Sequence, residues 1–159
     1  MTTIKLPDSW NDVTINQFIE LSQLENNSNH SLMVASILSD TDSEDIKKYD
    51  TDSFNRIINH LAWTNKLPEE SNWKPIIEVD GEKYGFINKL SQLTLGEWVD
   101  IEYYLEDYNN NIHKVLAIFY RPLITAINDN YRLIDEYDSN SMITRSELFK
   151  EKVLSLIHI

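Results

Sequence analysis

Hydrophobic and polar positions follow nearly the same pattern twice along this chain. Residues 13–21 (Val-Thr-Ile-Asn-Gln-Phe-Ile-Glu-Leu) and residues 93–101 (Leu-Thr-Leu-Gly-Glu-Trp-Val-Asp-Ile) keep their chemical type at eight of nine positions. The offset between the two copies is 80 residues, and a second apolar segment follows each copy, at residues 32–38 and 115–120. Apolar segments of this spacing are typical of amphipathic helices. The pattern predicts two related helical-hairpin halves.

Each copy opens with the signature of a helix N-terminus. Thr14 with Gln17, and Thr94 with Glu97, have the spacing of a capping box. In this motif the Thr hydroxyl accepts from the backbone N–H three residues later, and the Gln or Glu side chain reaches back to the Thr backbone. We therefore expect two helices to begin after Thr14 and Thr94.

Apolar side chains around the two caps indicate how the helices pack. In each copy, the apolar residue just before the cap and the apolar residue at the fourth helical position have the spacing of a hydrophobic staple. The two pairs are Val13 with Phe18 and Leu93 with Trp98. In the second helix, four apolar residues recur at spacings that share a face: Trp98, Ile101, Leu105 and Tyr108.

Polar breaks and a proline set the expected ends of these helices. Asn-rich segments at residues 26–29 and 109–111 each predict a short turn into an antiparallel return helix, and the second return helix should begin near His113. Pro122 disfavours helical backbone at Arg121, so the second return helix should stop or kink there.

Two further helices are predicted outside the repeat. Asp52 or Ser53 should cap a helix that ends near Lys66. Near the C-terminus, a third capping box, Thr144 with Glu147, predicts a helix that begins at Thr144, after a loop over residues 135–141.

The centre of the chain differs in kind. Residues 76–79, the pair Asp80-Gly81 and residues 82–87 have the alternation and the turn of a β-hairpin. An isolated hairpin is marginal in water, so it should pack on helices, join a longer sheet or add strands to a partner. The fold class we expect is mainly α, with two pseudo-repeated helical-hairpin halves joined by this central β-hairpin.

The predicted organisation is a single domain over residues 1–153. Its first half spans about 10–67, the hairpin about 74–88 and the second half about 91–153. The last six residues, 154–159, are the translation of a common transposon-end sequencing adaptor. We therefore interpret them as an adaptor-derived scar and expect the natural protein to continue beyond residue 153.

Charge and cysteine content narrow the function classes. The 14 basic and 26 acidic residues give a net charge of −12, which disfavours direct binding to nucleic acid or to anionic membranes. Two interpretations of the acidity stay open, a solvated surface and a passage through which nucleic acid slides. Cysteine is absent, which excludes disulfides, thiol nucleophiles and Cys-based zinc sites.

Candidate catalytic and metal-binding residues form no recognisable motif. None of the four histidines has the spacing of a metal pair, and they read as structural: His30, His60, His113 and His158. The segment from Asp40 to Asp45 begins like a calcium loop but lacks its glycine, so a loop followed by a capped helix is preferred. The sequence thus predicts no catalytic residue, no cofactor site and no metal site.

Arg121 is the most distinctive basic residue, because it stands next to Pro122. It could pair with acids of the preceding helix, reach a neighbouring subunit or simply lie on the surface. Together with the hairpin it marks the predicted partner contacts, which are Arg121, Pro122, Val79, Tyr84 and Phe86.

Residues 93–122 resemble small proteins of tailed phages that infect gut Bacteroidota, the crAss-like podovirus group. The segment that carries the resemblance runs from Leu-Thr-Leu-Gly-Glu-Trp through the Asn break to Ile-Phe-Tyr-Arg-Pro. The resemblance implies a non-enzymatic virion component or assembly factor, such as a neck or tail ring protein or a tail assembly chaperone. Its partners would be other phage structural proteins, or further copies of itself in a ring. It would be made in the host cytoplasm and, if structural, end in the virion.

Two other functions stay open on the sequence. The acidic surface could mimic nucleic acid and so inhibit or regulate a DNA-binding protein, which requires carboxylates spaced along one exposed face. A small hydrolase would require carboxylates that meet in a cleft.

Overall fold

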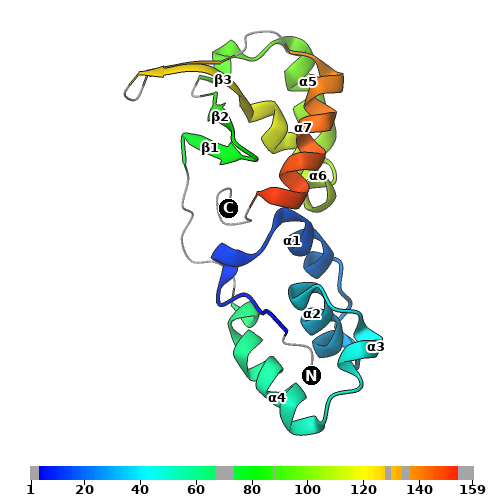
Figure 1. Ribbon diagram of the computed structural model, residues 1–159. Helices are drawn as coiled ribbons and strands as arrows, with labels where there is room; N and C mark the ends of the chain where they lie inside the picture. Colours follow the sequence, from blue (N-terminus) through cyan, green and yellow to red (C-terminus); the bar gives the residue numbers. More distant parts are fainter. Residues whose placement is uncertain (1–3, 67–73, 88, 128–129, 134–136, 154–159) are drawn as a thin grey trace. The chain divides into compact units, whose positions relative to one another are not determined.

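The chain is mainly helical and folds into two compact units, one over residues 4–66 and one that begins at residue 74 (Figure 1). The computed structural model describes residues 4–66, 74–87, 89–127, 130–133 and 137–153. The central hairpin belongs to the second unit, whereas it was expected as a link between two halves. The predicted scar at 154–159 lies outside the described residues.

The first unit consists of helices. In chain order they are the 3₁₀ helix η1 (Trp10–Asp12), α1 (Ile15–Ser22), α2 (His30–Ser39), α3 (Ser43–Ile46), α4 (Thr51–His60) and the 3₁₀ helix η2 (Leu61–Asn65). The predicted capping box of α1 is present, because the Gln17 N–H donates to Thr14 Oγ1 (3.2 Å) and the Thr14 N–H donates to Gln17 Oε1 (3.0 Å). The predicted start of this helix is therefore confirmed.

The cap of α4 is Asp50, and the prediction of Asp52 or Ser53 was wrong. One carboxylate oxygen of Asp50 accepts from the Ser53 N–H and the other from the Ser53 hydroxyl, both at 2.8 Å. A carboxylate that takes up two donors is a better helix start than the residues after it, which enter the first turn. Since η2 extends the helix to Asn65, the expected end near Lys66 agrees with the structure.

The core of the first unit is small and has an aromatic edge. Its central cluster of buried apolar residues is Val13, Val34, Ala35, Leu38, Ile46 and Leu61. The Trp10 ring packs edge-on against Phe18 (5.9 Å between centroids) and Trp63 (5.2 Å), and its indole N–H donates to the Lys66 carbonyl (2.9 Å). Trp10 thus covers the side of α1 that carries Phe18.

The second unit combines strands and helices. Its elements are β1 (Ile76–Val79), β2 (Glu82–Phe86), the 3₁₀ helix η3 (Leu90–Gln92), α5 (Leu95–Leu105), α6 (Tyr108–Phe119), β3 (Tyr120–Ile127), β4 (Asn130–Leu133) and α7 (Ser139–Lys152). The predicted hairpin is present, with β1 antiparallel to β2. Asp80 (φ 50°) and Gly81 (φ 83°) both have positive φ, as a type I′ turn requires.

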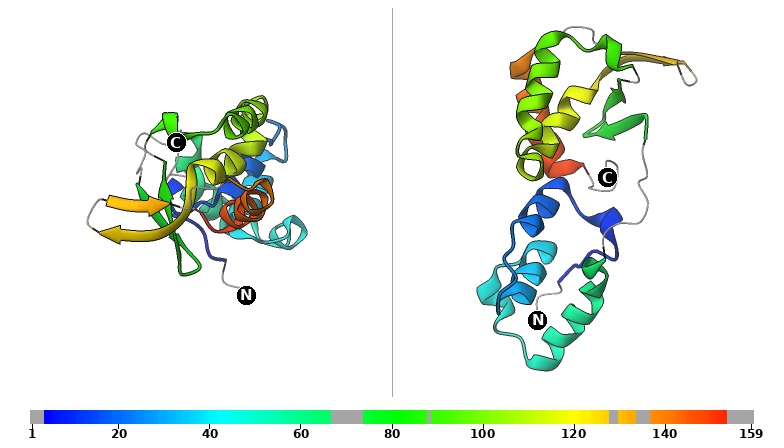
Figure 2. Two further views of the ribbon diagram at one scale, coloured as in Figure 1. Left: turned by 90° about the horizontal axis from the view of Figure 1, so that it is seen from above. Right: turned by 180° about the vertical axis from the view of Figure 1, so that it is seen from behind.

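Strand β3 follows α6 directly and has two partners in succession. Its first three residues pair with β2, so that Tyr120 lies opposite Phe86 and Pro122 opposite Tyr84. Its later residues pair with β4 and complete the strand order β1-β2-β3-β4. The β3–β4 ribbon extends away from the helices of its own unit (Figures 1 and 2). The expected helix stop before Pro122 is thus confirmed, and the strand that replaces the helix was not predicted.

Two helix starts in this unit differ from the predictions. Helix α6 begins at Tyr108, so the Asn109–Asn111 segment lies inside the helix and His113 stands in its interior. Helix α7 begins at Ser139, because an Asp138 carboxylate oxygen accepts from the Ser141 N–H (2.8 Å). Thr144 is therefore an interior residue, and residues 139–141 of the expected loop are helical.

The core of the second unit joins the sheet to the helices. Tyr84 on β2 packs edge-on against Phe149 on α7, with 5.0 Å between ring centroids. Helix α6 packs against both α5 and α7. Tyr120 is fully buried, and its hydroxyl donates to the Lys74 carbonyl (2.6 Å). In the part of the chain that the structure describes, every helix is too short or too polar to cross a membrane.

Candidate functional site

Helix α5 is fixed to its unit by a buried carboxylate. Glu97 is 0% exposed and serves two partners. Its Oε2 accepts from the Thr94 N–H (2.6 Å) and from the Thr94 hydroxyl (2.8 Å), which completes the predicted capping box. Its Oε1 forms an ion pair with Nη2 of buried Arg121 on β3. The start of α5 is therefore tied to the sheet.

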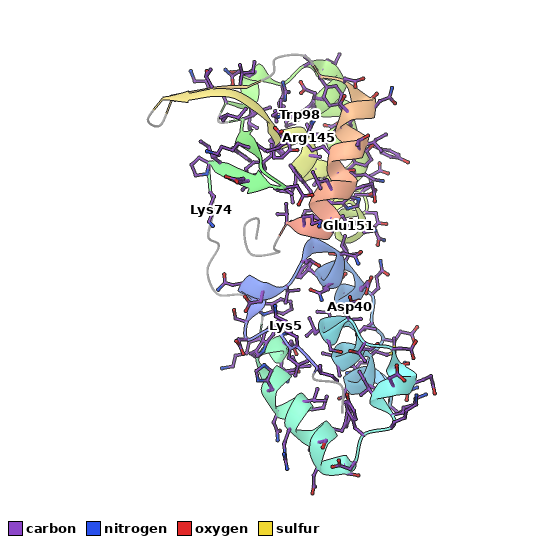
Figure 3. The ribbon with its side chains drawn as sticks, in the orientation of Figure 1. Lys5, Asp40, Lys74, Trp98, Arg145 and Glu151 are labelled. Carbon is purple, nitrogen blue, oxygen red and sulfur yellow. The ribbon has the colours of Figure 1, made fainter. Side chains whose placement is uncertain are left out.

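Further polar contacts hold α5 and α6 from the inside. The Tyr137 hydroxyl donates to Asp100 Oδ2 (2.5 Å), and burial raises the pKa of Tyr137, so the hydroxyl stays a donor at neutral pH. Arg145, labelled on α7 in Figure 3, donates from Nε (3.0 Å) and Nη2 (2.7 Å) to the Ala117 carbonyl in the last turn of α6. Burial lowers the pKa of Arg145, yet a guanidinium stays charged at neutral pH.

The opposite side of α5 is apolar and exposed. Leu95 is 80% exposed, Val99 53% and Tyr103 66%, and these three residues follow one another at intervals of four. Trp98 and Leu105 flank them and are also exposed. The Trp98 indole N–H donates to Glu102 Oε1 (2.9 Å), so the polar atom of this ring already has a partner. We call Leu95, Trp98, Val99, Tyr103 and Leu105 the α5 face.

The charged residues in the stretch of chain that contains the α5 face are acidic, and Lys114, which follows this stretch on α6, lies over the Tyr104 ring, 5.1 Å from its centroid. Residues 90–113 contain five acidic residues and no Lys or Arg. Two of the five, Glu97 and Asp100, hold the inner side of the helix, whereas Glu102, Glu106 and Asp107 are exposed. The α5 face is therefore an apolar stripe with a mainly anionic border.

The matching positions of the first unit are covered. Ile15 stands in the same place relative to its capping box as Leu95, and it is 1% exposed. Ile19, the counterpart of Val99, is also buried, and Phe18, the counterpart of Trp98, contacts the Trp10 ring. The same pattern of side chains is thus buried in α1 and exposed in α5.

The five predicted contact residues have structural positions in the second unit. Val79 and Tyr84 are buried, and Phe86 stacks on Phe119 with 5.4 Å between ring centroids. Pro122 lies opposite Tyr84 in the sheet, and Arg121 is paired with Glu97. Of the roles considered for Arg121, pairing with an acid is the one observed, although the acid comes from α5, and the surface role was wrong. Contact of these residues with a partner stays a prediction.

The described histidines have ordinary structural partners. Burial lowers the pKa of His113 to about 4, and its Nε2 lies 3.7 Å from Glu147 Oε1. His60 Nε2 lies 3.1 Å from the Pro7 carbonyl oxygen, and His30 Nδ1 lies 3.2 Å from the Glu25 carbonyl oxygen. Within the residues that the structure describes, no three His, Asp or Glu side chains are grouped to hold a metal ion.

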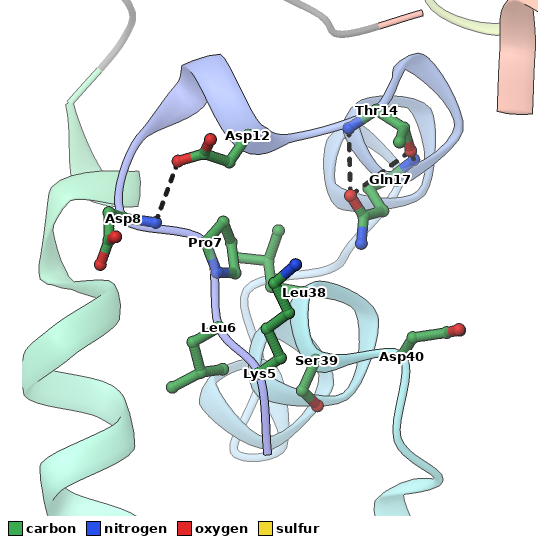
Figure 4. Close-up of a pocket in the computed structure, with 10 residues that line it drawn as sticks. All are labelled: Lys5, Leu6, Pro7, Asp8, Asp12, Thr14, Gln17, Leu38, Ser39 and Asp40. Atoms are coloured by element: carbon green, nitrogen blue, oxygen red, sulfur yellow. Dashed lines mark hydrogen bonds between the residues drawn. The ribbon is translucent and has the colours of Figure 1, made fainter. Parts of the chain in front are cut away.

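A hollow of about 500 Å³ in the first unit carries three carboxylates (Figure 4). Asp8 and Asp40 stand on opposite sides of it and point away from each other, and Asp12 accepts from the Asp8 N–H (3.3 Å). A general acid–base pair requires two groups that reach one substrate, which this arrangement does not provide.

The acidic segment at the end of α2 is a loop followed by a capped helix, as the sequence predicted. Asp40 closes α2 with φ 51°, and Asp42 Oδ1 accepts from the Glu44 N–H (2.7 Å) at the start of α3. The Glu44 carboxylate pairs with Lys47. Asp42 thus serves as a helix cap and Glu44 as one half of an exposed ion pair.

The α5 face was not predicted, although one feature of the sequence indicates it. Apolar residues occur all round α5, so whichever side packs on the unit, apolar side chains remain on the other. The expected staple contact between Leu93 and Trp98 implied that Trp98 lies in the core.

Comparison with protein-family models, with curated proteins and with solved structures found no match to this chain.

Proposed function

We propose that this chain is a non-enzymatic virion or virion-assembly protein of a tailed phage, either a neck or tail ring component or a tail assembly chaperone. It acts by protein–protein contacts. The observation that carries the proposal is the exposed α5 face, where Trp98 and Tyr103 stand among exposed aliphatic residues. Contiguous exposed apolar side chains mark interaction sites, and Trp and Tyr are enriched among the residues that dominate binding.

The phage assignment depends on the resemblance of residues 93–122. This segment includes all of α5 and ends at Pro122 on β3. The element with the apolar exposed face is therefore also the element that resembles the phage proteins, which supports a shared contact role.

We further propose that the two helix starts descend from one duplicated element. Thr14 and Thr94 cap their helices through the same pair of hydrogen bonds, and Ala35 and Ala117, which align after the repeat, are both fully buried. In this view the apolar side of the first copy is buried, while the second copy uses it for a partner.

The test is co-purification with the structural proteins encoded beside this gene. Each neighbouring portal, neck or tail protein is co-expressed with the full chain, and the complexes are sized by light scattering. A ring component should form an ordered oligomer, alone or on its neighbour, whereas a chaperone should form a small complex with an aggregation-prone tail protein. A monomer that binds none of these proteins, or a gene that lies in a host operon, contradicts the proposal.

A further inference from the structure

We infer that the α5 face is a docking surface for an amphipathic segment of another protein, one whose apolar side chains are flanked by Lys and Arg. This inference rests on the proposed function, since it names the chemistry of the partner that the protein–protein contacts require. It goes beyond that function because it selects one surface and one class of occupant.

The geometry of the face suits the apolar side of a helix. Leu95, Val99 and Tyr103 recur every four residues, the spacing that two packed helices use to interdigitate. Trp98 adds a ring whose N–H is bonded to Glu102, so its carbon surface can be covered without leaving a buried donor unsatisfied.

The inner side of α5 is held in place by contacts within its own unit, without a partner. Glu97 joins the cap of α5 to Arg121 on β3, and Asp100 accepts from the Tyr137 hydroxyl. A surface on a preorganised helix loses little conformational freedom on binding. The α5 face is therefore presented as a rigid surface.

The charge around the face selects among possible occupants. A second copy of this chain would bring Glu102, Glu106 and Asp107 against the same carboxylates, because residues 90–113 carry no compensating Lys or Arg. Like charges that meet across an interface oppose binding. A partner with basic residues beside its apolar ones would instead form ion pairs with these carboxylates. We therefore infer a partner of that kind.

The experiment uses a synthetic amphipathic helix of Leu and Lys as the probe and the full chain as the receptor. A Leu/Glu peptide of the same pattern is the matched control peptide. Binding is followed by anisotropy of the labelled peptide, and the site by hydrogen exchange of residues 95–105. We expect the Leu/Lys peptide to bind and to protect this segment, and the Leu/Glu peptide to bind at least about tenfold more weakly, a difference of about 1.4 kcal/mol.

Two pairs of variants locate the site. Leu95→Ser/Val99→Ser should weaken binding about tenfold or more. Ile124→Ser/Ile143→Ser, which changes two exposed apolar residues outside α5, should change it less than about twofold. Glu102→Gln/Glu106→Gln should weaken binding about threefold to tenfold. The equal charge change Glu25→Gln/Asp52→Asn in the first unit should have little effect.

Three results overturn the inference: equal binding of the two peptides, equal effects of the α5 and control variants, or a dimer that Leu95→Ser/Val99→Ser dissociates. Failure here is distinguishable from failure of the proposed function. If a phage neighbour binds the chain and the α5 variants leave that binding intact, the function stands and this surface is wrong. If the peptide binds α5 but no phage neighbour binds, the surface stands and the assigned function is wrong.

Discussion

Glu97 and Arg121 connect the first turn of α5 to strand β3 inside the second unit. One oxygen of the carboxylate completes the cap with Thr94, and the other pairs with the guanidinium. Both side chains are buried, so each charge has lost its water. The gain from a buried pair is often close to its desolvation cost, yet removal of one partner leaves an uncompensated charge.

Arg121→Met should therefore destabilise the second unit strongly. The substitution leaves the Glu97 carboxylate buried without its cation, and such changes cost about 3–5 kcal/mol. We expect earlier unfolding in urea and faster hydrogen exchange in α5 and in β2–β3. Arg56→Met is the matched control, because Arg56 is exposed on α4, and it should change stability little.

A second change at Glu97 should recover part of the loss. In Glu97→Gln/Arg121→Met no buried charge is left unpaired, and the amide oxygen can still accept from the Thr94 N–H. The double variant should be more stable than Arg121→Met alone, which a double-mutant cycle measures. Equal stability of the two would show that the charges do not interact.

The two glycines with defined surroundings should respond to alanine in opposite directions. Gly81 has φ 83° and open space around it, so Gly81→Ala costs only backbone strain, about 1 kcal/mol. Gly96 lies in the first turn of α5, and its nearest neighbour is Thr94 Oγ1 at 4.0 Å. Gly96→Ala should stabilise by about 0.5 kcal/mol because it restricts the unfolded chain. Thermal unfolding of both variants checks the signs.

Asp138 and Thr144 test where α7 begins. The Ser141 hydroxyl, and after it the Ser141 N–H, lowers the pKa of Asp138. Asp138→Ala should destabilise α7 at neutral pH, whereas Thr144→Ala should be neutral or slightly stabilising, since Ala has the higher helix propensity. A depressed carboxyl pKa means that the contribution of Asp138 is present above its unfolded pKa and is lost as pH falls through its folded pKa. The opposite ranking of the two variants by hydrogen exchange in α7 would contradict the observed cap.

His113 should make the second unit sensitive to mild acid. Burial, the largest cause, lowers its pKa from 6.5 to about 4, while Glu147 raises it and Lys150 and Lys114 lower it. Between these values the unfolded chain binds the proton and the folded chain does not, so stability falls as pH drops from about 6.5 to about 4. The total effect is on the order of 3 kcal/mol, and above pH 6.5 the group contributes no pH dependence.

The control for His113 is a variant that cannot titrate at this position. His113→Leu has a similar volume, and the difference in unfolding free energy between it and the natural chain should change over this pH window. Urea titrations at several pH values measure that difference. Two curves that run parallel from pH 7 to pH 4 would mean that His113 is protonated in the folded state.

Local patterns predicted the elements whose signals are local. The Thr14 and Thr94 boxes and the Asp80-Gly81 turn each depend on residues within a few positions, and the structure has all three. The box at Thr144 has the same letters but is overridden, because Asp138 with Ser141 starts the helix earlier. In α7 the cap that lies earlier in the chain sets the helix start. The spacing of the residues alone does not show which of the two candidate caps is used.

The candidate site could not be predicted from spacing, because burial depends on distant partners. Glu97 is buried against Arg121 of β3, and that strand was not predicted although β-branched residues precede the sequence Asn-Asp-Asn. Asp100 is held by Tyr137, which lies 37 positions away. The inner side of α5 thus carries two acids beside buried Ile101, which departs from the usual apolar inner face of a helix.

The ion pair between Glu97 and Arg121 also restricts how this sequence can diverge. A lineage that loses one of the two charges is left with a destabilised second unit, and return to full stability requires a change at the other position. Positions 97 and 121 should therefore covary among relatives, as acid with base or as two neutral residues. Such covariation would record the contact between helix and strand in the sequences alone.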